Sequence, residues 1–471
     1  MQSEQKKVKP ITIDRKRENC DGNGKNKVEN PARALDGRKA MKTNKRQKFL
    51  TASVVLALVG LTVSAVPANA ADPGVTSSTI KLGITVPMTG IASPGYNKIP
   101  GAMKAYFDYV NANGGVNGRK INLVIKDDQY IPRTAVARAN ELILRDRVFA
   151  LVGTLGTAST KAISASTQLA SRGIPSLFVN TGFSGFADKK AYPTTFSILP
   201  SYQMEAKIMA KFVKENYAGK KIALIYQDDD FGRDALAGFK TAGLTFDTLI
   251  PYASGSQALP ATGAGWISKL KAAGSEVTVM FGVTSATTAA LANAFAGGFK
   301  TQWVLGSVGG DATTIAATNR AFVPLLNGAK GFSFAPAPTD ASDEYIKLFQ
   351  GIYAAALPKE TFDNNVVAGM SNAFLAVQAL KAAGTKLTRA GLIKAIEAKG
   401  STFASPFLTP LGYSTTSHIG ATGYWVGTYG PTGALTPDGG KYTVFTTDSG
   451  SGPVVASTYK RPAMPAKGLP N

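Results

Sequence analysis

Residues 149–160, FALVGTLGTAST, combine glycine with small hydroxyl side chains in a spacing that could bind a small molecule. The apolar run 149–152 predicts a short buried strand. Thr157 and Ser159 follow Gly156, where a helical pattern begins. A strand, a tight turn and a helix start expose free backbone N–H groups at the edge of an α/β sheet. We therefore expect this turn to hold the polar head of a ligand; the alternative is an ordinary strand-to-helix turn with a Ser or Thr cap.

Three further sets of polar residues are candidates for acid–base catalysis or metal binding. Asp127 and Asp128 end a predicted strand and could form an acid–base pair, but a helix cap or loop contact is the favoured interpretation. Residues 228–230 are three aspartates that resemble the start of a calcium loop without its glycine and final glutamate, which favours a solvated turn or cleft rim. His418 is the only histidine and lies in a Ser-, Thr- and Gly-rich stretch, so we expect it to be solvated.

The sequence does not contain the common catalytic patterns. It has no G-x-S-x-G, H-E-x-x-H, P-loop or G-x-G-x-x-G motif, and the single histidine has no evident triad partner. Cys20 is the only cysteine, which leaves no cysteine pair for a disulfide or a metal site. We therefore expect a binding protein without a cofactor or metal, not an enzyme.

Length and charge limit the class of protein further. A chain of 471 residues with 44% hydrophobic content is expected to fold into two or three compact units. The formal net charge is +22, and residues 1–70 alone hold 15 Lys and Arg against 6 Asp and Glu. The remaining excess is spread out and has no aromatic-plus-basic pattern, so no nucleic-acid partner is expected.

Residues 41–70 have the three parts of a secretory signal. Met41 opens a basic stretch, residues 49–66 are apolar, and residues 68–70 form an A-x-A cleavage motif. We expect cleavage near Ala70 and an extracytoplasmic mature chain, with a retained anchor as the alternative. Residues 1–40 are polar and aperiodic, which indicates either a disordered extension or a true start at Met41.

The rest of the chain alternates strand and helix patterns in two successive series. The first series has predicted strands at 80–86, 121–125, 149–152 and 174–178. The second has predicted strands at 221–226, 249–250, 277–282 and 302–305. Such βα alternation predicts two doubly wound, mostly parallel sheets.

The C-terminal third changes character. A strand is predicted at 331–335, followed by three helices at 343–355, 366–383 and 388–399. Antiparallel strands are predicted at 423–428 and 441–446. The last residues, with prolines at 462, 465 and 470, are expected to be frayed.

Several motifs, taken in order and spacing, are shared with a known family. They are PMTG at 87–90, NANGGVNGRKINLVIKDDQY at 111–130, FALVGTLGTAST at 149–160, GIPSLFV at 173–179, ALIYQDDDFGRD at 223–234 and TPLGY at 409–413. With these the chain resembles the type I periplasmic substrate-binding proteins of branched-chain amino acid ABC transporters, the leucine/isoleucine/valine-binding family. The resemblance runs over nearly all of the predicted mature chain.

This resemblance implies an α/β fold of two doubly wound, Rossmann-like lobes joined by a hinge of three crossings. Lobe 1 would comprise 75–198 with 338–405, and lobe 2 would comprise 202–332 with 410–460. The crossings would lie near 197–201, 331–338 and 407–413. The ligand would lie between the lobes, and closure would present the receptor to a membrane permease.

The resemblance also implies the ligand-binding positions. The turn that grips the ligand's α-carboxylate falls on Thr157, Ala158 and Ser159, and the next turn of lobe 1 falls on Thr181 and Gly182. In lobe 2 the family's cleft positions fall on Phe231, Thr284 and Ser307. For each position the alternative is a packing or loop role.

Ser307 is a departure, because the family has an amine-binding acid on or near this position. A buried ammonium without a carboxylate is costly. Either Asp229, Asp230 or Asp311 reaches into the site, or the ligand lacks an α-amino group. The implied function is a monomeric solute receptor that delivers an amino acid or related carboxylate or amide to an ABC permease. A secreted sensor for a signalling partner and a hydrolase on the same fold remain alternatives.

Overall fold

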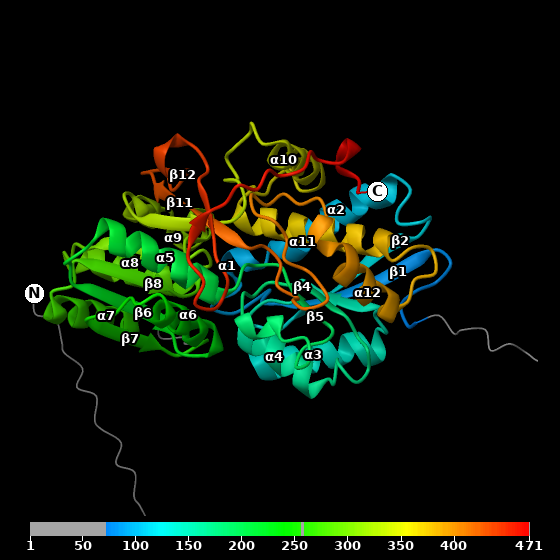
Figure 1. Ribbon diagram of the computed structural model, residues 1–471, viewed down its shortest axis with the longest axis horizontal. Helices are drawn as coiled ribbons and strands as arrows, with labels where there is room; N and C mark the ends of the chain where they lie inside the picture. Colours follow the sequence, from blue (N-terminus) through cyan, green and yellow to red (C-terminus); the bar gives the residue numbers. More distant parts are fainter. Residues whose placement is uncertain (1–71, 256–258, 471) are drawn as a thin grey trace, which may run out of the picture. The chain divides into compact units, whose positions relative to one another are not determined.

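The computed structural model describes residues 72–255 and 259–470, so the predicted extension 1–40 and the signal peptide 41–70 lie outside the described residues. The described chain forms two α/β lobes, each built on its own sheet (Figure 1). The sheet of lobe 1 is parallel, and its strands in spatial order are β2 (Lys120–Asp127), β1 (Thr79–Val86), β3 (Ala150–Val152), β4 (Ser176–Val179) and β5 (Thr195–Ser197).

Helices cover both faces of the lobe 1 sheet, as the predicted βα alternation requires. α3 (Pro132–Asn140) and α4 (Thr157–Ser166) pack on one face, where Leu151 of β3 belongs to their apolar cluster. α2 (Ile99–Ala112) and α11 (Asn364–Ala382) lie side by side and pack on the other face. The central strands β3 and β4 are buried on both sides because helices cover both faces, whereas the edge strand β2 has exposed residues.

The sheet of lobe 2 is parallel at its centre and antiparallel toward one edge. Its strands in spatial order are β14 (Val455–Ala456), β13 (Val444–Thr446), β11 (Gly423–Tyr429), β10 (Lys330–Ser333), β9 (Gln302–Leu305), β8 (Val277–Phe281), β6 (Ile222–Gln227) and β7 (Thr248–Tyr252), with β12 (Leu435–Pro437) paired to β11. The antiparallel strands expected near 423–428 and 441–446 are therefore present as β11 and β13.

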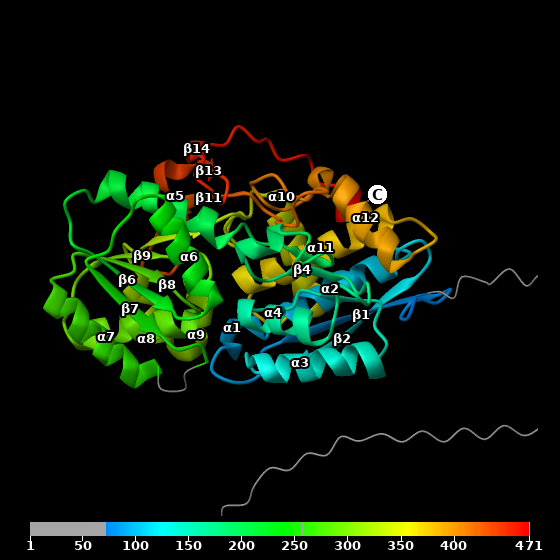
Figure 2. The same ribbon diagram turned by 60° about the horizontal axis from the view of Figure 1, so that its bottom comes forward.

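Helices lie on both faces of the lobe 2 sheet as well (Figure 2). α5 (Tyr202–Asn216) and α6 (Asp230–Thr241) share one apolar cluster with the sheet. α7 (Leu259–Ala273) and α8 (Thr284–Ala296) pack on the opposite face. The remaining elements are α1 (Ser93–Tyr96), α9 (Ala312–Asn319), α10 (Glu344–Ala356), α12 (Arg389–Lys399), and the short turns η1 (Glu141–Arg145), η2 (Ser184–Ala187), η3 (Arg320–Leu326), η4 (Gly400–Thr402), η5 (Asp438–Gly440) and η6 (Ala466–Gly468). None of the helices described here has the length and apolar character needed to cross a bilayer.

Three segments connect the sheets. Residues 198–201 join β5 to α5, residues 334–343 join β10 to α10, and residues 403–422 join η4 to β11. Each of these segments overlaps one of the three crossings that the resemblance implies. The helices between the second and third segments pack against lobe 1, since α10 and α11 both contact α2.

The C-terminal end is docked, and the prediction that it is frayed was wrong. After β14 the chain runs to lobe 1, where the hydroxyl of Tyr106 on α2 donates to the carbonyl of Gly468 at 2.6 Å. The backbone N–H of Met464 donates to the Glu344 carboxylate at 2.7 Å. These partners lie more than 100 residues away in sequence. Local composition carries no information about such distant partners. The prolines therefore wrongly indicated a frayed end.

His418 is fully buried, so the prediction of a solvated histidine was also wrong. Its ring stacks on Phe196 at a centroid distance of 3.8 Å, and its two nitrogens lie 3.1 Å from the carbonyl of Thr195 and 3.2 Å from the Glu397 carboxylate. Burial lowers the pKa of His418, although Glu397 opposes this effect. The residue therefore fastens the third crossing segment to lobe 1.

Candidate functional site: a cavity between the two lobes

The cavity has a volume of about 160 Å³ and lies where the parallel strands of both sheets end. Its lining includes residues that directly follow β3, β4, β8 and β9, and it also includes parts of the crossing segments. In open parallel sheets this edge gathers loops and helix N-termini that can bind a ligand. An apolar cavity of this order is large enough for a benzene-sized molecule.

The N-terminus of α4 contributes uncapped backbone donors to this cavity. Gly156 precedes the helix with φ of 94° and has no side chain to act as a cap. Within the described chain, the N–H groups of Thr157, Ala158 and Ser159 have no hydrogen-bond partner. Gly156 and Thr157 line the cavity. The partial positive charge of the helix end therefore faces the place where an anionic group could bind.

Gly156 is required at this turn for two reasons, which leads to a prediction. A φ of 94° is unfavourable for any residue with a Cβ, and a Cβ here would lie 2.8 Å from Cε2 of Tyr130. Gly156→Ala should therefore displace the turn and lower the melting temperature by several degrees, corresponding to about 1–3 kcal/mol. Gly173→Ala is the control for the contact with Tyr130, because Gly173 also has a positive φ, of 58°, but has open space around it. Equal effects in the two variants, measured by circular dichroism, would contradict the special role of Gly156.

The structure brings some of the predicted lobe 1 residues together. The hydroxyls of Thr157 and Thr181 share a hydrogen bond of 2.6 Å, and both residues are buried. Gly182 lies behind the cavity wall, where a Cβ would approach the carbonyl of Pro200 to 2.3 Å. Ala158 and Ser159 belong to the first turn of α4, but their side chains do not line the cavity. Of the five lobe 1 predictions, only Thr157 is a lining residue.

Of the predicted lobe 2 residues, two line the cavity and one does not. Phe231 lines the cavity and packs edge-on against Tyr202 at 4.7 Å. Ser307 also lines the cavity. The Thr284 hydroxyl donates to the carbonyl of Val308 at 3.2 Å, so Thr284 holds the wall without lining it.

Asp311 is the one acid of the three alternatives that lines the cavity. Its side chain is 6% exposed, caps α9 by accepting from the N–H of Thr314 at 2.6 Å, and accepts from Asn364 Nδ2 at 3.0 Å. A carboxylate can accept more than two hydrogen bonds, so Asp311 could also accept from a ligand. No lysine, arginine or histidine is among the residues that line the cavity.

Asp229 and Asp230 have other roles. Asp229 caps α6, where it accepts from the N–H of Phe231 at 2.9 Å and from Gln227 Nε2 at 2.8 Å. Asp230 forms an ion pair of 2.6 Å with Lys161 of α4, which links the two lobes.

Sequence reasoning missed Glu205, which lies directly behind Ser307. The carboxylate is fully buried; it accepts from the Ser307 N–H at 2.5 Å, from the Ser307 hydroxyl at 3.1 Å and from the Tyr424 hydroxyl at 3.1 Å. Burial raises the pKa of Glu205 to about 7, and these hydrogen bonds oppose the increase. A signal was present: Glu205 falls on the apolar face that Tyr202, Ala206 and Met209 form along α5.

The two aspartates at the end of β2 hold the loop that carries Tyr130. Asp128 accepts from the Thr85 hydroxyl at 2.6 Å and from the Tyr130 N–H at 2.9 Å, and burial raises the pKa of Asp128 to about 6. Asp127 accepts backbone N–H groups of the neighbouring loops. These contacts agree with the favoured loop role. Tyr130, which sequence reasoning did not place in the site, lines the cavity beside Gly156.

No metal site accompanies this cavity in the described chain, where no group of three or more His, Cys, Asp or Glu is placed to hold an ion. The polar groups that line it can instead bind a small molecule with an anionic end and a donor end. Uncapped N–H groups come from lobe 1, and the Asp311 carboxylate comes from lobe 2.

Comparison with known proteins agrees with this geometry. A relative from Brucella melitensis, named Leu/Ile/Val-binding protein homolog 3, is 28% identical over 354 residues, which cover 72% of this chain and 88% of the relative. The structure of a branched-chain amino acid ABC transporter protein from Thermus thermophilus with bound valine gives a TM-score of 0.69 at 20% identity, covering 80% of this chain and 98% of that one. A fatty acid ABC transporter substrate-binding protein from Thermomonospora curvata gives a TM-score of 0.69 at 22% identity, covering 80% and 95%.

The two solved structures confirm the two-lobe fold. The Brucella and Thermomonospora relatives are binding proteins by name, not enzymes. The family model described as periplasmic binding protein matches residues 79–434, which is most of the chain. The chain therefore belongs to the periplasmic binding protein family.

Proposed function

We propose that the protein is an extracytoplasmic receptor that binds a small amino acid, or a related carboxylate or amide, between its lobes and delivers it to an ABC permease. The observation that carries the proposal is the pairing of opposite polar groups in one cavity. The uncapped N-terminus of α4 comes from lobe 1, and the Asp311 carboxylate comes from lobe 2. A zwitterion complements both groups at once.

In this proposal the ligand carboxylate accepts hydrogen bonds from the N–H groups of Thr157, Ala158 and Ser159, while the ligand ammonium donates to Asp311. Each such charge-assisted contact contributes about 1.5–3 kcal/mol when water is excluded. Ser307, held by Glu205, adds a polar group near the donor end. The names of the Leu/Ile/Val-binding relatives support an amino acid as the ligand.

Contacts between the lobes support a hinge that closes over the ligand. In addition to the Lys161–Asp230 ion pair, the N–H of Ser184 in lobe 1 donates to Asp234 in lobe 2 at 2.7 Å. Tyr96 in lobe 1 donates to the carbonyl of Val308 in lobe 2 at 3.3 Å. A ligand that bridges the same two lobes favours the closed arrangement, which a permease can distinguish from the open one. We propose that the receptor acts as a monomer.

A panel of metabolites tests the proposal. A ligand that binds only the folded protein must raise its melting temperature, so thermal shift is measured with L-leucine, L-isoleucine, L-valine, their amides and the corresponding amine-free acids. We expect one of these classes to raise the melting temperature by several degrees and to bind by calorimetry with one site. If none of these compounds binds at millimolar concentration, the proposed function is wrong.

A further inference from the structure

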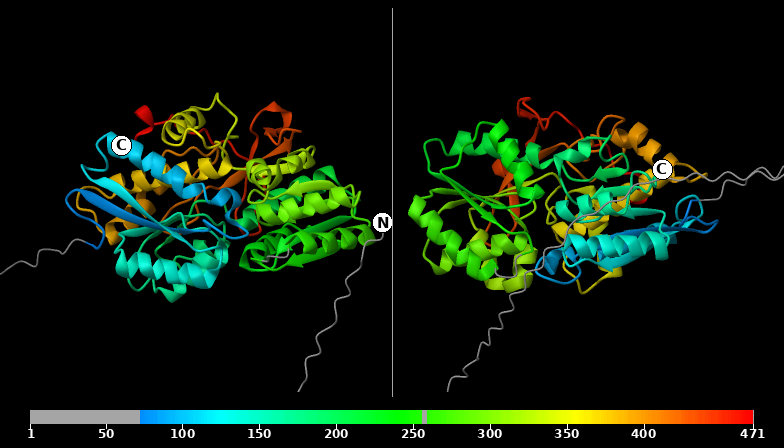
Figure 3. Two further views of the ribbon diagram at one scale, coloured as in Figure 1. Left: turned by 180° about the vertical axis from the view of Figure 1, so that it is seen from behind. Right: turned by 90° about the horizontal axis from the view of Figure 1, so that it is seen from below.

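The chain crosses between the lobes a fourth time, after the last strand of lobe 2. β14 pairs with β13, and the N–H of Ser457 donates to the carbonyl of Val444 at 2.8 Å, so this point is fixed to the lobe 2 sheet. From there residues 457–470 run to lobe 1, and we call them the strap (Figure 3). The family match ends at residue 434. The strap therefore lies outside the matched region, and the three crossings of the family do not account for it.

The far end of the strap is docked on the helices of lobe 1. The hydroxyl of Tyr109 on α2 donates to the carbonyl of Lys467 at 2.8 Å. Lys381 on α11 donates to the carbonyl of Pro470. These contacts add to the hydrogen bond that α2 makes with Gly468. Because two helices of lobe 1 hold it, this end must move together with lobe 1.

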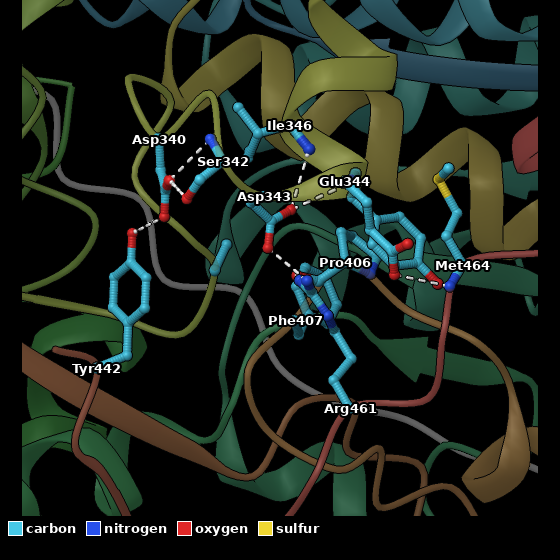
Figure 4. Close-up of polar contacts among 12 residues, drawn as sticks. Asp340, Ser342, Asp343, Glu344, Ile346, Pro406, Phe407, Tyr442, Arg461 and Met464 are labelled. Atoms are coloured by element: carbon cyan, nitrogen blue, oxygen red, sulfur yellow. Dashed lines mark hydrogen bonds and ion pairs between the residues drawn. The ribbon is translucent and has the colours of Figure 1, made fainter.

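Arg461 fixes the strap to two of the other crossings (Figure 4). Its guanidinium donates to the carbonyl of Pro406, near the beginning of the third segment, at 2.8 Å, and forms an ion pair with Asp343, which ends the second segment and caps α10. The guanidinium also lies 4.9 Å from the ring centroid of Tyr345. The paired side chains are 15% and 8% exposed, so solvent screens their attraction only weakly. A planar guanidinium held on several sides is a rigid clamp.

The strap is short between its two fixed points. Residues 458–460 alone separate Ser457, which lobe 2 holds, from Arg461, which the second and third segments hold. An extended chain covers at most about 3.6 Å per residue, so this piece spans no more than about 14 Å. A motion that moves the two points further apart must break the contacts of one of them.

The first segment, residues 198–201, is the other short crossing. It contacts the end of the third segment, where the N–H of Ala421 donates to the carbonyl of Ile198 at 3.1 Å, whereas the strap contacts the same segment at Pro406. A single short tether lets two bodies both bend and twist. Two short tethers at different points leave mainly a rotation about the line that joins them.

We propose that the strap is a fourth hinge connection that limits the lobes to one opening motion, with Arg461 as the positioning residue that clamps it. The inference rests on the hinge motion of the proposed function, but it does not depend on which ligand binds. Without the clamp, the ligand-free protein samples wider and twisted arrangements, and a smaller share of them can close on a ligand. The apparent dissociation constant rises in inverse proportion to that share.

Distances between two spin labels test the strap without any ligand. Cys20 is the only cysteine, so a Cys20→Ser background accepts labels at chosen positions. Ala137→Cys on α3 and Ala264→Cys on α7 place one label on an exposed position of each lobe (Figure 2). Adding Arg461→Ala should broaden the distribution of label distances measured by pulsed electron spin resonance and extend it by several ångströms.

Arg233→Ala is the matched control for the loss of an arginine–aspartate pair. Arg233 pairs with Asp228 at 2.9 Å, and both residues belong to lobe 2. This variant should therefore leave the distance distribution unchanged. A merely structural role of Arg461 would lower the melting temperature without broadening the distribution, and that result would overturn the proposal.

A longer strap tests the tether while Arg461 keeps its contacts. Insertion of Gly-Ser-Gly-Ser after Thr458 lengthens the reach by up to about 14 Å and should also broaden the distribution. The same insertion after Thr385, an exposed position between α11 and α12, is the control. The insertion also decides the question if Arg461→Ala is not folded by circular dichroism. Equal distributions with the long and the natural strap would show that the strap does not limit the motion.

The same labels with L-leucine separate this inference from the proposed function. We expect L-leucine to narrow the distribution to the same closed distance with and without the clamp, and its affinity by calorimetry to fall several-fold in Arg461→Ala. Equal affinities would contradict the effect of the strap on capture. If L-leucine changes no distribution while Arg461→Ala still broadens it, the result counts against the proposed function and supports the strap.

Discussion

Replacing Asp311 by asparagine should weaken the binding of L-leucine about a hundredfold. The carboxylate is buried in the cavity wall and no lysine, arginine or histidine lines that cavity, so a ligand ammonium would be its only cationic partner there. A charge-assisted hydrogen bond in such a place contributes up to about 3 kcal/mol. Asparagine is a good N-cap and keeps the contact with the N–H of Thr314, so the fold should persist.

Two controls make the Asp311 experiment specific. Asp230→Asn removes a carboxylate that pairs with Lys161 and does not line the cavity, so it should change leucine affinity far less. The amine-free acid 4-methylpentanoate should not lose affinity in the Asp311→Asn variant, because it has no ammonium. Calorimetry measures all combinations. Unchanged leucine binding in Asp311→Asn would show that the donor end of the ligand lies elsewhere.

Glu205→Gln should remove a large part of the pH dependence of stability. Burial raises the pKa of Glu205 to about 7 from its ordinary value of 4.5, so the folded state holds a proton that the unfolded state has lost. The free energy of unfolding therefore falls as pH rises from about 4.5 to 7, by roughly 3 kcal/mol in total. Glutamine cannot lose this proton and should not show that decrease.

Urea unfolding at pH 5 and pH 8 measures the effect of Glu205. The loss of stability between these two pH values should be roughly 3 kcal/mol larger for the natural protein than for Glu205→Gln. Glu215→Gln, an exposed position on the same helix, should behave like the natural protein. Other carboxyl groups whose pKa is raised by burial, including that of Asp128, affect all three proteins alike. The same pH dependence in all three would show that Glu205 is ionised in the fold over this range.

The layered fold could be predicted from sequence because its signals are local. The apolar run at β3 followed by Gly156 predicts both a buried strand and the helix start that faces the cavity. The crossings near 197–201 and 331–338 were implied by the family resemblance, and β5 (Thr195–Ser197), which precedes the first of them, was not predicted. Hydrophobic periodicity and glycine placement depend only on neighbours in the chain. Both can therefore be recognised in the sequence without knowledge of the tertiary structure.

The rest of the site depends on partners that are distant in sequence. Asp311 could be named only as one of three candidates, because its selection depends on the position of α11 and Asn364. Glu205 is 102 residues away from Ser307, and Trp425 is 90 residues away from Ala335. His418 and the docked C-terminal residues were misjudged for the same reason, since local polarity and proline content do not report tertiary burial.

The position of the crossing segments has a consequence for how variants of this protein are to be interpreted. Residues of these segments line the cavity, so the pivot of the lobes would also touch a ligand bound there. A substitution at Phe407 would alter the complementarity of the pocket and the stiffness of the pivot together. An equilibrium constant combines both contributions, whereas stopped-flow rates of capture and release separate them.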